Sequence, residues 1–558
     1  MQSKTEFSLE TPGLAIRPVV WLVLALLAVL NLLSFSAFAQ GGPVRLNGLL
    51  VEGGDIRRSI ISPDGATVVY AADQDIDEVF ELYSVSIDGG VPVKLNEPLD
   101  GQRDVSTSFT VTPDGRRIIY RASQDTVGVF ELFSVPIEGG VVTKLNDPLP
   151  GGADVTLALV SPDSETVFYV ADQITNDVIE LFRVPAAGGT VAKLNDALTP
   201  GGDVLFSPRV SPDGSTVVYL ADGETDNVRE LFSVSSAGGA VTKLNPPLSS
   251  TGDVDGLNLR ISADSTTVVF RANQSSSDGQ ALFSVPINGG AATQLNGPLV
   301  SGGNVNRAEI TSDSSRVVYL ADQDTDDLVE LFSAPIGGGV AVKLSDPEVG
   351  NVFSSFSLSS DGAMVVYRPS DEFGEIFSVP VDGGTPTRLS AVLPATDRIG
   401  GFQISPDASS VVYSSFSTIV NAVGKTAAKG GPPLNALFSV PLTGGPVTQI
   451  LERFPDGSGI RSSAIFPDSG SVFFIADRDT AGLFELFAVS LGGGAVEKIN
   501  APLVNGGRVL SFSFAPNGTH VLYEAEQNVA GVVELFSVSR NAIGVLDPLF
   551  SDGFEEAP

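Results

Sequence analysis

The chain has 558 residues, and its 66 acidic side chains against 32 basic ones give a formal net charge of −34. So negative a surface argues against binding to nucleic acid, whose phosphates need lysine and arginine, and it disfavours anionic membranes. The absence of cysteine excludes disulfides, thiol catalysis and cysteine-ligated zinc.

Residues 1–39 have the pattern of an export signal peptide. Lys4 and Arg17 precede an apolar run over residues 19–30, and an Ala-Phe-Ala cleavage site follows at residues 37–39. This run fits the apolar core of a signal peptide better than a membrane span, which needs about 20 residues. Two glutamates in the basic region make an uncleaved anchor the alternative. We expect an exported protein, periplasmic or secreted, without a membrane span once the signal is removed.

Residues 40–540 form ten repeats, each with a turn of the Ser-Pro-Asp-Gly type. The turns begin at Ser62, Thr112, Ser161, Ser211, Ser262, Thr311, Ser359, Ser405, Phe466 and Ala515. Nearly every step is 46 to 51 residues, and the exception, 61 residues, reflects an insertion between Tyr413 and Leu437. Lysines, glycines and prolines in this insertion predict an exposed loop. Self-similarity at such a period is typical of a repeat architecture.

Residues 201–248 represent one repeat. Their alternating and apolar runs predict four short strands, over residues 203–210, 216–221, 230–234 and 241–244. The second strand is apolar on both faces and therefore needs cover on both sides. A four-stranded meander cannot bury two faces alone, but a ring of meanders can, as in a β-propeller.

The recurring pattern resembles the TolB-like, WD40-like (PD40) β-propeller repeat family. It consists of the Ser-Pro-Asp-Gly turn, an apolar strand, a Leu-Phe strand, a Gly-Gly turn and a basic residue before Leu-Asn, and it covers roughly residues 41–540. The resemblance implies an exported all-β propeller. TolB-type proteins also carry an N-terminal α/β domain, which we do not expect here, and they have fewer blades. The partners of TolB are therefore not implied.

The spacing of the repeats favours a single ring of about ten four-stranded blades. Thirteen residues separate the third and fourth strands in every complete repeat, as between Leu82 and Leu95, and no repeat is followed by a long linker. Because propellers usually have four to eight blades, two smaller rings are the alternative. The fourth-strand pattern at residues 44–47 precedes any first strand, which predicts that it completes the tenth blade. A weaker copy of the fourth-strand pattern at residues 545–549, in the acidic C-terminal tail 541–558, is the alternative closing strand.

Acidic residues collect in the loops opposite the Ser-Pro-Asp-Gly and Gly-Gly turns. Carboxylates at alternate positions give the opening spacing of a calcium loop, because calcium takes several oxygen ligands. The candidate ligands are Asp73, Asp75 and Asp77 in the first repeat and Asp322, Asp324 and Asp326 in the sixth. The glycine and glutamate that complete such a loop are missing, so the alternative is that these side chains cap the loops and solvate the surface. Calcium is the one cofactor that the sequence suggests.

Basic residues recur at one position of the fourth strand. These residues are Arg45, Lys94, Lys144, Lys193, Lys243, Lys343, Arg388 and Lys498. Lysine on an edge strand discourages pairing with other edges. A basic rim for an anionic partner is the alternative.

The sequence offers little for catalysis. His520 is the only histidine, and its place at the exit of a turn predicts a surface position. A Gly-x-Ser-x-Gly nucleophile elbow does not occur. We therefore expect a non-enzymatic TolB-like propeller that acts as a protein-binding or scaffold module, with partners in the cell envelope or outside the cell. The alternatives are a calcium-stabilised surface protein and a carboxylate-dependent hydrolase or lyase.

Overall fold

The computed structural model describes residues 41–544, except 250, 274–278, 347–349, 370–373, 395–396, 418–433, 453 and 455–457. The predicted export signal, most of the insertion in the eighth repeat and the chain from residue 545 lie outside the described residues. The propeller belongs to the compact unit that begins at Pro43. Within the described part of the chain, no helix has the length and hydrophobicity that crossing a bilayer requires.

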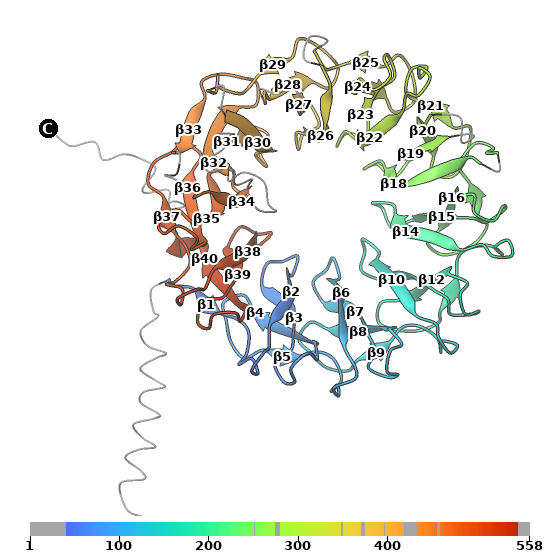
Figure 1. The fold of residues 1–558 in the computed structure, drawn as a ribbon. Coiled ribbons are helices and arrows are strands. Elements are labelled where there is room, and N and C mark those ends of the chain that lie inside the picture. The colour runs from blue at the N-terminus through green and yellow to red at the C-terminus, as the bar shows by residue number, and fades with distance from the viewer. Residues whose placement is uncertain are drawn as a thin grey trace, which may run out of the picture. The chain divides into compact units, whose positions relative to one another are not determined.

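Ten antiparallel blades of four strands each form a ring, which confirms the predicted all-β propeller with a single ring (Figure 1). The first strands lie on the inner side of the ring in Figure 1, and the fourth strands lie toward the outside.

The first strands are β2 (Ile56–Ile61), β6 (Val105–Val111), β10 (Val155–Val160), β14 (Val204–Val210), β18 (Asp253–Ile261), β22 (Val305–Ile310), β26 (Val352–Leu358), β30 (Asp397–Ile404), β34 (Ile460–Ile465) and β38 (Val509–Phe514). The second strands are β3 (Thr67–Ala72), β7 (Arg117–Ala122), β11 (Thr166–Ala171), β15 (Thr216–Ala221), β19 (Thr267–Asn273), β23 (Arg316–Ala321), β27 (Met364–Pro369), β31 (Ser410–Ser417), β35 (Ser471–Ala476) and β39 (His520–Ala525).

The third strands are β4 (Glu81–Ser86), β8 (Glu131–Pro136), β12 (Glu180–Pro185), β16 (Glu230–Ser235), β20 (Ala281–Pro286), β24 (Glu330–Pro335), β28 (Phe377–Pro380), β32 (Leu434–Pro441), β36 (Glu485–Ser490) and β40 (Glu534–Ser539). The fourth strands are β5 (Val93–Lys94), β9 (Thr143–Lys144), β13 (Ala192–Lys193), β17 (Thr242–Lys243), β21 (Thr293–Gln294), β25 (Val342–Lys343), β29 (Thr387–Arg388), β33 (Thr448–Leu451), β37 (Glu497–Lys498) and β1 (Val44–Arg45). A 3₁₀ helix, η1 (Arg540–Ala542), follows β40.

The core lies between neighbouring blades and is built mainly from the second and third strands, with apolar residues of the first strands and of the segments after the fourth strands. Val217, Val218 and Tyr219 of β15 are all buried, because blades cover both faces of this strand. In most blades the second-strand aromatic ring stacks on a third-strand ring, as Tyr120 does on Phe133 at a centroid distance of 5.6 Å. Offset stacking of this kind stabilises aromatic pairs beyond the area they bury.

The Ser-Pro-Asp-Gly turns also connect the blades. The fourth residue of the turn has a left-handed backbone, with φ of 74° at Gly65 and 68° at Ser164. Glycine adopts this conformation freely, whereas serine is strained there. The Ser164 hydroxyl compensates by accepting a hydrogen bond from the backbone N–H of Asp114 in the preceding blade, at 2.9 Å. The same bond recurs between other blades, including those of Asp213 and Ser265.

The N-terminal strand closes the ring, as the sequence predicted. Strand β1 pairs with β40 in antiparallel register, with Val44 opposite Ser537 and Arg45 opposite Phe536. Leu46 is fully buried in a cluster that joins the first and tenth blades. At the other end of the chain, Ile543 falls in the predicted tail but is buried against the last two blades.

Candidate functional site

The acidic loops contain the six predicted calcium ligands, and two of these carboxylates are structural. Asp73 is buried and accepts hydrogen bonds from the backbone N–H groups of Asp55 and Glu78. Asp322 holds the same position in the sixth blade, where it accepts from Asn304 at 2.6 Å and Asp327 at 3.4 Å. These carboxylates tie the start of a first strand to the loop between the second and third strands.

The other four candidate ligands divide into two kinds. Asp75 and Asp324 form ion pairs with fourth-strand lysines, Lys94 and Lys343. Asp77 and Asp326 are exposed at the loop tips. The structure brings Asp322 and Asp326 together with Asp327, which the sequence analysis did not select, so that carboxylate oxygens of the three lie within 4.8 Å of one another. Calcium binding at these loops stays a prediction.

Calcium binding can be tested at the loop tips without disturbing the fold. Millimolar calcium should raise the melting temperature more than sodium chloride of equal ionic strength, and Asp77→Asn with Asp326→Asn should remove the difference. Asp73→Asn is unsuitable for this test, because its amide would place a donor against a backbone N–H and destabilise the loop by about 1–3 kcal/mol. Differential scanning calorimetry measures both effects. An equal response to the two salts would contradict calcium binding.

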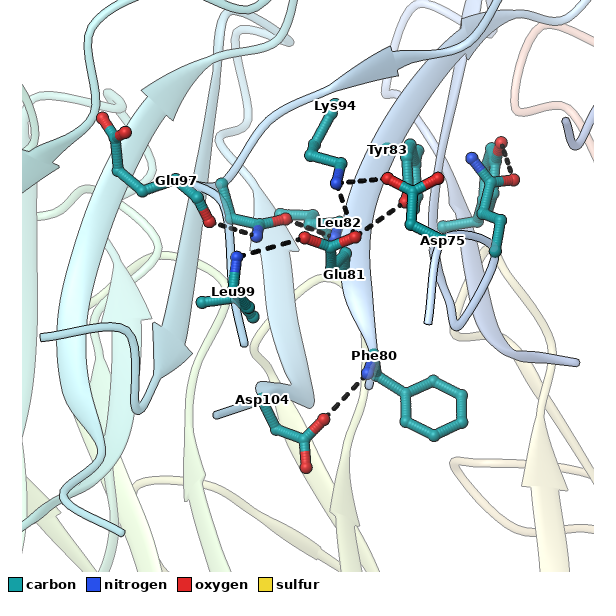
Figure 2. Close-up of polar contacts among 12 residues, drawn as sticks. Asp75, Phe80, Glu81, Leu82, Tyr83, Lys94, Glu97, Leu99 and Asp104 are labelled. Carbon is teal, nitrogen blue, oxygen red and sulfur yellow. Dashed lines mark hydrogen bonds and ion pairs between the residues drawn. The ribbon is translucent and has the colours of Figure 1, made fainter. Parts of the chain in front are cut away.

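The eight fourth-strand bases are each neutralised by a carboxylate of the same blade. In the first blade, the Lys94 ammonium donates hydrogen bonds to Asp75 and to the buried carboxylate of Glu81, at 2.6 Å for the latter (Figure 2). Burial opposes the charged ammonium, but the hydrogen bonds to these two carboxylates raise the pKa of Lys94 above its usual value. The equivalent pairs are Lys144–Glu131, Lys193–Glu180, Lys243–Glu230, Lys343–Glu330, Lys498–Glu485, Arg45–Glu534 and Arg388–Glu375. These bases therefore stabilise the blades and do not form a free basic rim.

His520 is buried, so the predicted surface position is wrong. Its residue exposure is 8%, and its Nε2 lies 3.1 Å from Asp88 Oδ1. Asp88 belongs to the first blade, whereas His520 begins β39 of the tenth. The histidine is covered because closure of the ring brings a turn of the first blade over it.

The inner wall of the ring, formed by the ten first strands, carries a basic set of residues that the sequence analysis missed. Its seven arginines are Arg57, Arg58, Arg209, Arg260, Arg307, Arg398 and Arg461. The same strands contain four acidic residues, Asp253, Asp255, Glu309 and Asp397. The inner wall is therefore net positive in a chain of charge −34. The signal was present in the sequence, but it appears only when the first strands are compared with one another.

Three of the wall arginines lack an acidic partner among the described residues: Arg58, Arg209 and Arg461. Their exposure shows that solvent reaches the inner wall. Arg461 stacks on the ring of Phe484 at 4.0 Å, and Arg58 donates to the carbonyl of Thr107. Stacking on an aromatic ring holds a guanidinium in place while its donors stay available.

Three cavities open along this wall, and each contains arginine. One of about 460 Å³ lies among the fifth, sixth and seventh blades, where Arg260 forms a bidentate pair with Glu309. Another, of about 280 Å³, includes Arg57, Arg58 and Glu524 between the first and tenth blades. The third, of about 180 Å³, lies among the first three blades.

Comparison with known proteins describes the fold and assigns no activity. No protein-family model and no curated protein matches the chain. Among solved structures, a prolyl endopeptidase matches with a TM-score of 0.37 and 13% identity, over 65% of this chain and 55% of its own. A putative TolB from Agrobacterium tumefaciens matches at 0.26 and 16%, over 47% and 83%. An oligogalacturonate lyase in complex with manganese matches at 0.33 and 14%, over 70% and 100%. This chain thus spans about half the length of the prolyl endopeptidase.

These structures correct the prediction of a non-enzymatic scaffold. That prediction treated a propeller without a nucleophile elbow or a usable histidine as a binding module. The matched structures include peptidases and a lyase, and a non-enzymatic scaffold is therefore not established. At 13–14% identity the similarity concerns the fold alone. The absence of a nucleophile elbow therefore does not separate an enzyme from a binding module.

Proposed function

We propose that the protein binds a polycarboxylate ligand along the inner wall of the ring. The observation that carries the proposal is the set of wall arginines without an acidic partner among the residues that the structure describes, Arg58, Arg209 and Arg461, in a strongly acidic chain. Arginine offers a planar fork of donors that matches the two oxygens of a carboxylate. Fourth-strand lysines could not serve in the same way, because buried glutamates already neutralise them.

The acidic outer surface is compatible with an anionic ligand inside the ring. At physiological ionic strength the Debye length is about 8 Å, so charges beyond that distance are largely screened. Close to the wall, the nearest charges are the guanidinium groups. The hydroxyl group of Ser108 lies beside Arg58 and adds a neutral donor, whereas the Ser59 and Ser511 hydroxyls already donate to Glu524.

The proposal predicts that arginines of the wall determine affinity. Titration of the mature protein with hexaglutamate, followed by calorimetry, should give saturable binding that weakens with added salt. The double variant Arg209→Gln and Arg461→Gln should bind at least about a hundredfold more weakly, because each lost hydrogen bond to a charged group contributes about 1.5–3 kcal/mol.

The matched control for this experiment is Arg116→Gln. Arg116 is an arginine of a Ser-Pro-Asp-Gly turn, away from the wall, with 84% side-chain exposure. It removes one positive charge, as each of the two wall substitutions does, and it should leave the affinity for hexaglutamate unchanged. If Arg116→Gln weakens the affinity for hexaglutamate equally, the effect is due to net charge alone. If no binding is seen at millimolar hexaglutamate, the proposal is refuted.

We also propose that the ten repeats belong to the TolB-like, WD40-like family and that the protein works outside the cytoplasm. The recurring Ser-Pro-Asp-Gly turns support the first statement, and the signal pattern at residues 1–39 supports the second. Cell fractionation with an antibody against the ring tests export. Recovery of the chain in the cytoplasm at full length would contradict it.

A further inference from the structure

The smallest of the three wall cavities carries the least compensated positive charge. Its polar lining consists of Arg58, Arg121, Ser108 and Thr110, from the first and second blades, and its volume is about 180 Å³. No acidic residue lines it, whereas Glu309 and Glu524 line the other two cavities. Two guanidinium groups therefore line this cavity without a carboxylate among its described lining residues, although Asp154 nearby attracts the charge of Arg121 without a hydrogen bond to it.

Arg121 corresponds to Arg271 in another blade, and the two arginines differ in their acidic partners. Arg121 of β7 donates to the carbonyl of Val155 at 2.6 Å, and Arg271 of β19 donates in the same way to Val305 in the next blade. Both arginines therefore link a second strand to the neighbouring first strand. Arg271, however, also pairs with Asp255, whose side chain is 15% exposed.

In the second blade, Ser106 has the corresponding position along the strand, although Asp255 is the strand partner of Arg271 whereas the register of β6 shifts directly after Val105. Ser106 follows Val105, which pairs with Ala122, just as Asp255 follows Val254, which pairs with Ala272. The Nε of Arg121 is buried and has no hydrogen-bond partner in the described part of the chain. A buried donor on a charged group without a partner costs free energy, so an acceptor supplied by a ligand would be stabilising.

We propose that the cavity lined by Arg58, Arg121, Ser108 and Thr110 binds one oxyanion group, a carboxylate or a phosphate, of the ligand. This inference rests on the proposed function and names where the ligand is anchored. The two guanidinium groups neutralise the oxyanion, and the Ser108 hydroxyl donates to one of its remaining lone pairs, whereas the Thr110 hydroxyl donates to the carbonyl of Val111. The volume suits one such group with a short attached chain, so the rest of the ligand extends along the wall.

The test installs the missing counter-ion. Ser106→Asp places a carboxylate where the fifth blade has Asp255 and leaves the bond from Arg121 to Val155 in place. In the wild-type protein, inorganic phosphate or malonate should raise the melting temperature saturably at constant ionic strength, and Ser106→Asp should lose this rise. Ser357→Asp, which adds the same charge to β26 across the ring, should keep it. Arg121→Met should lose the rise as a second variant.

The outcomes separate the pocket from the proposed function. A rise with one probe alone identifies the oxyanion, carboxylate or phosphate, that the pocket takes. If the rise in melting temperature persists in Ser106→Asp, or if sodium chloride reproduces it, the proposed oxyanion site is wrong. If hexaglutamate binding to the wild type depends on Arg209 and Arg461 while neither small probe raises the melting temperature, only the proposed oxyanion site is refuted and the proposed function stands. If hexaglutamate does not bind the wild type, the proposed function fails.

Discussion

Removal of residues 41–48 should lower the melting temperature of the protein more than any single substitution. The deletion takes away β1 and leaves the edge of β40 unpaired and open to other chains. It also removes Leu46, which is fully buried between the first and tenth blades, and the Asn47 side chain, which accepts from the backbone N–H of Leu535 at 2.8 Å. The loss should amount to several kcal/mol, a large share of a total that is typically about 5–15 kcal/mol.

Single substitutions measure how much each side chain contributes to the stability that the deletion removes. Leu46→Ala should cost about 2–5 kcal/mol, because it opens a cavity in a closed cluster. Asn47→Ala should cost about 1–3 kcal/mol, because it leaves a buried N–H without an acceptor. Val44→Ala serves as the control and should cost less than 1 kcal/mol, because Val44 is 38% exposed. Urea denaturation measures all three, and a deletion variant as stable as the wild type would mean that β1 does not hold the ring closed.

Alkaline pH should unfold the protein sharply just above pH 10. All nine tyrosines have a raised pKa, with burial as the main cause, and burial raises the pKa of Tyr367 to about 12. In the unfolded chain they ionise near pH 10. The unfolded state therefore loses protons first, and stability falls as the pH rises above 10. Each tyrosine contributes about 1.4 kcal/mol per pH unit, so nine contribute about 12 kcal/mol per unit.

Two optical signals check this expectation. Tyrosinate absorbance at 295 nm and far-ultraviolet circular dichroism should change together in one cooperative transition. Tyr219→Phe is the matched variant, because the Tyr219 hydroxyl has no hydrogen bond among the described residues. It should be neutral at pH 7 and shift the transition to higher pH. Gradual ionisation before loss of the circular dichroism signal would mean that the tyrosines are accessible in the folded ring.

The candidate sites differ in how far local sequence could predict them. The first Asp of each acidic loop looked like a calcium ligand, because alternate carboxylates are visible in a short stretch. Asp73 instead accepts two backbone N–H groups, and one of these belongs to Asp55, 18 residues away. Similarly, the pairing of Lys94 with Glu81 joins two strands. Spacing along the chain reveals which residues recur, but not which partner satisfies each charge.

The sequence by itself determined the ten blades, their four strands and the closing strand at residues 44–47. These features depend on local periodicity and on turn residues, and both recur in each repeat. The tertiary structure alone decided that Arg58, Arg209 and Arg461 share one wall and that Arg121 has no ion pair like the one that Asp255 forms with Arg271, among the described residues. It also decided that His520 is covered by Asp88. The physical reason is that charge compensation and burial arise between blades, from residues that the ring brings together across long stretches of chain.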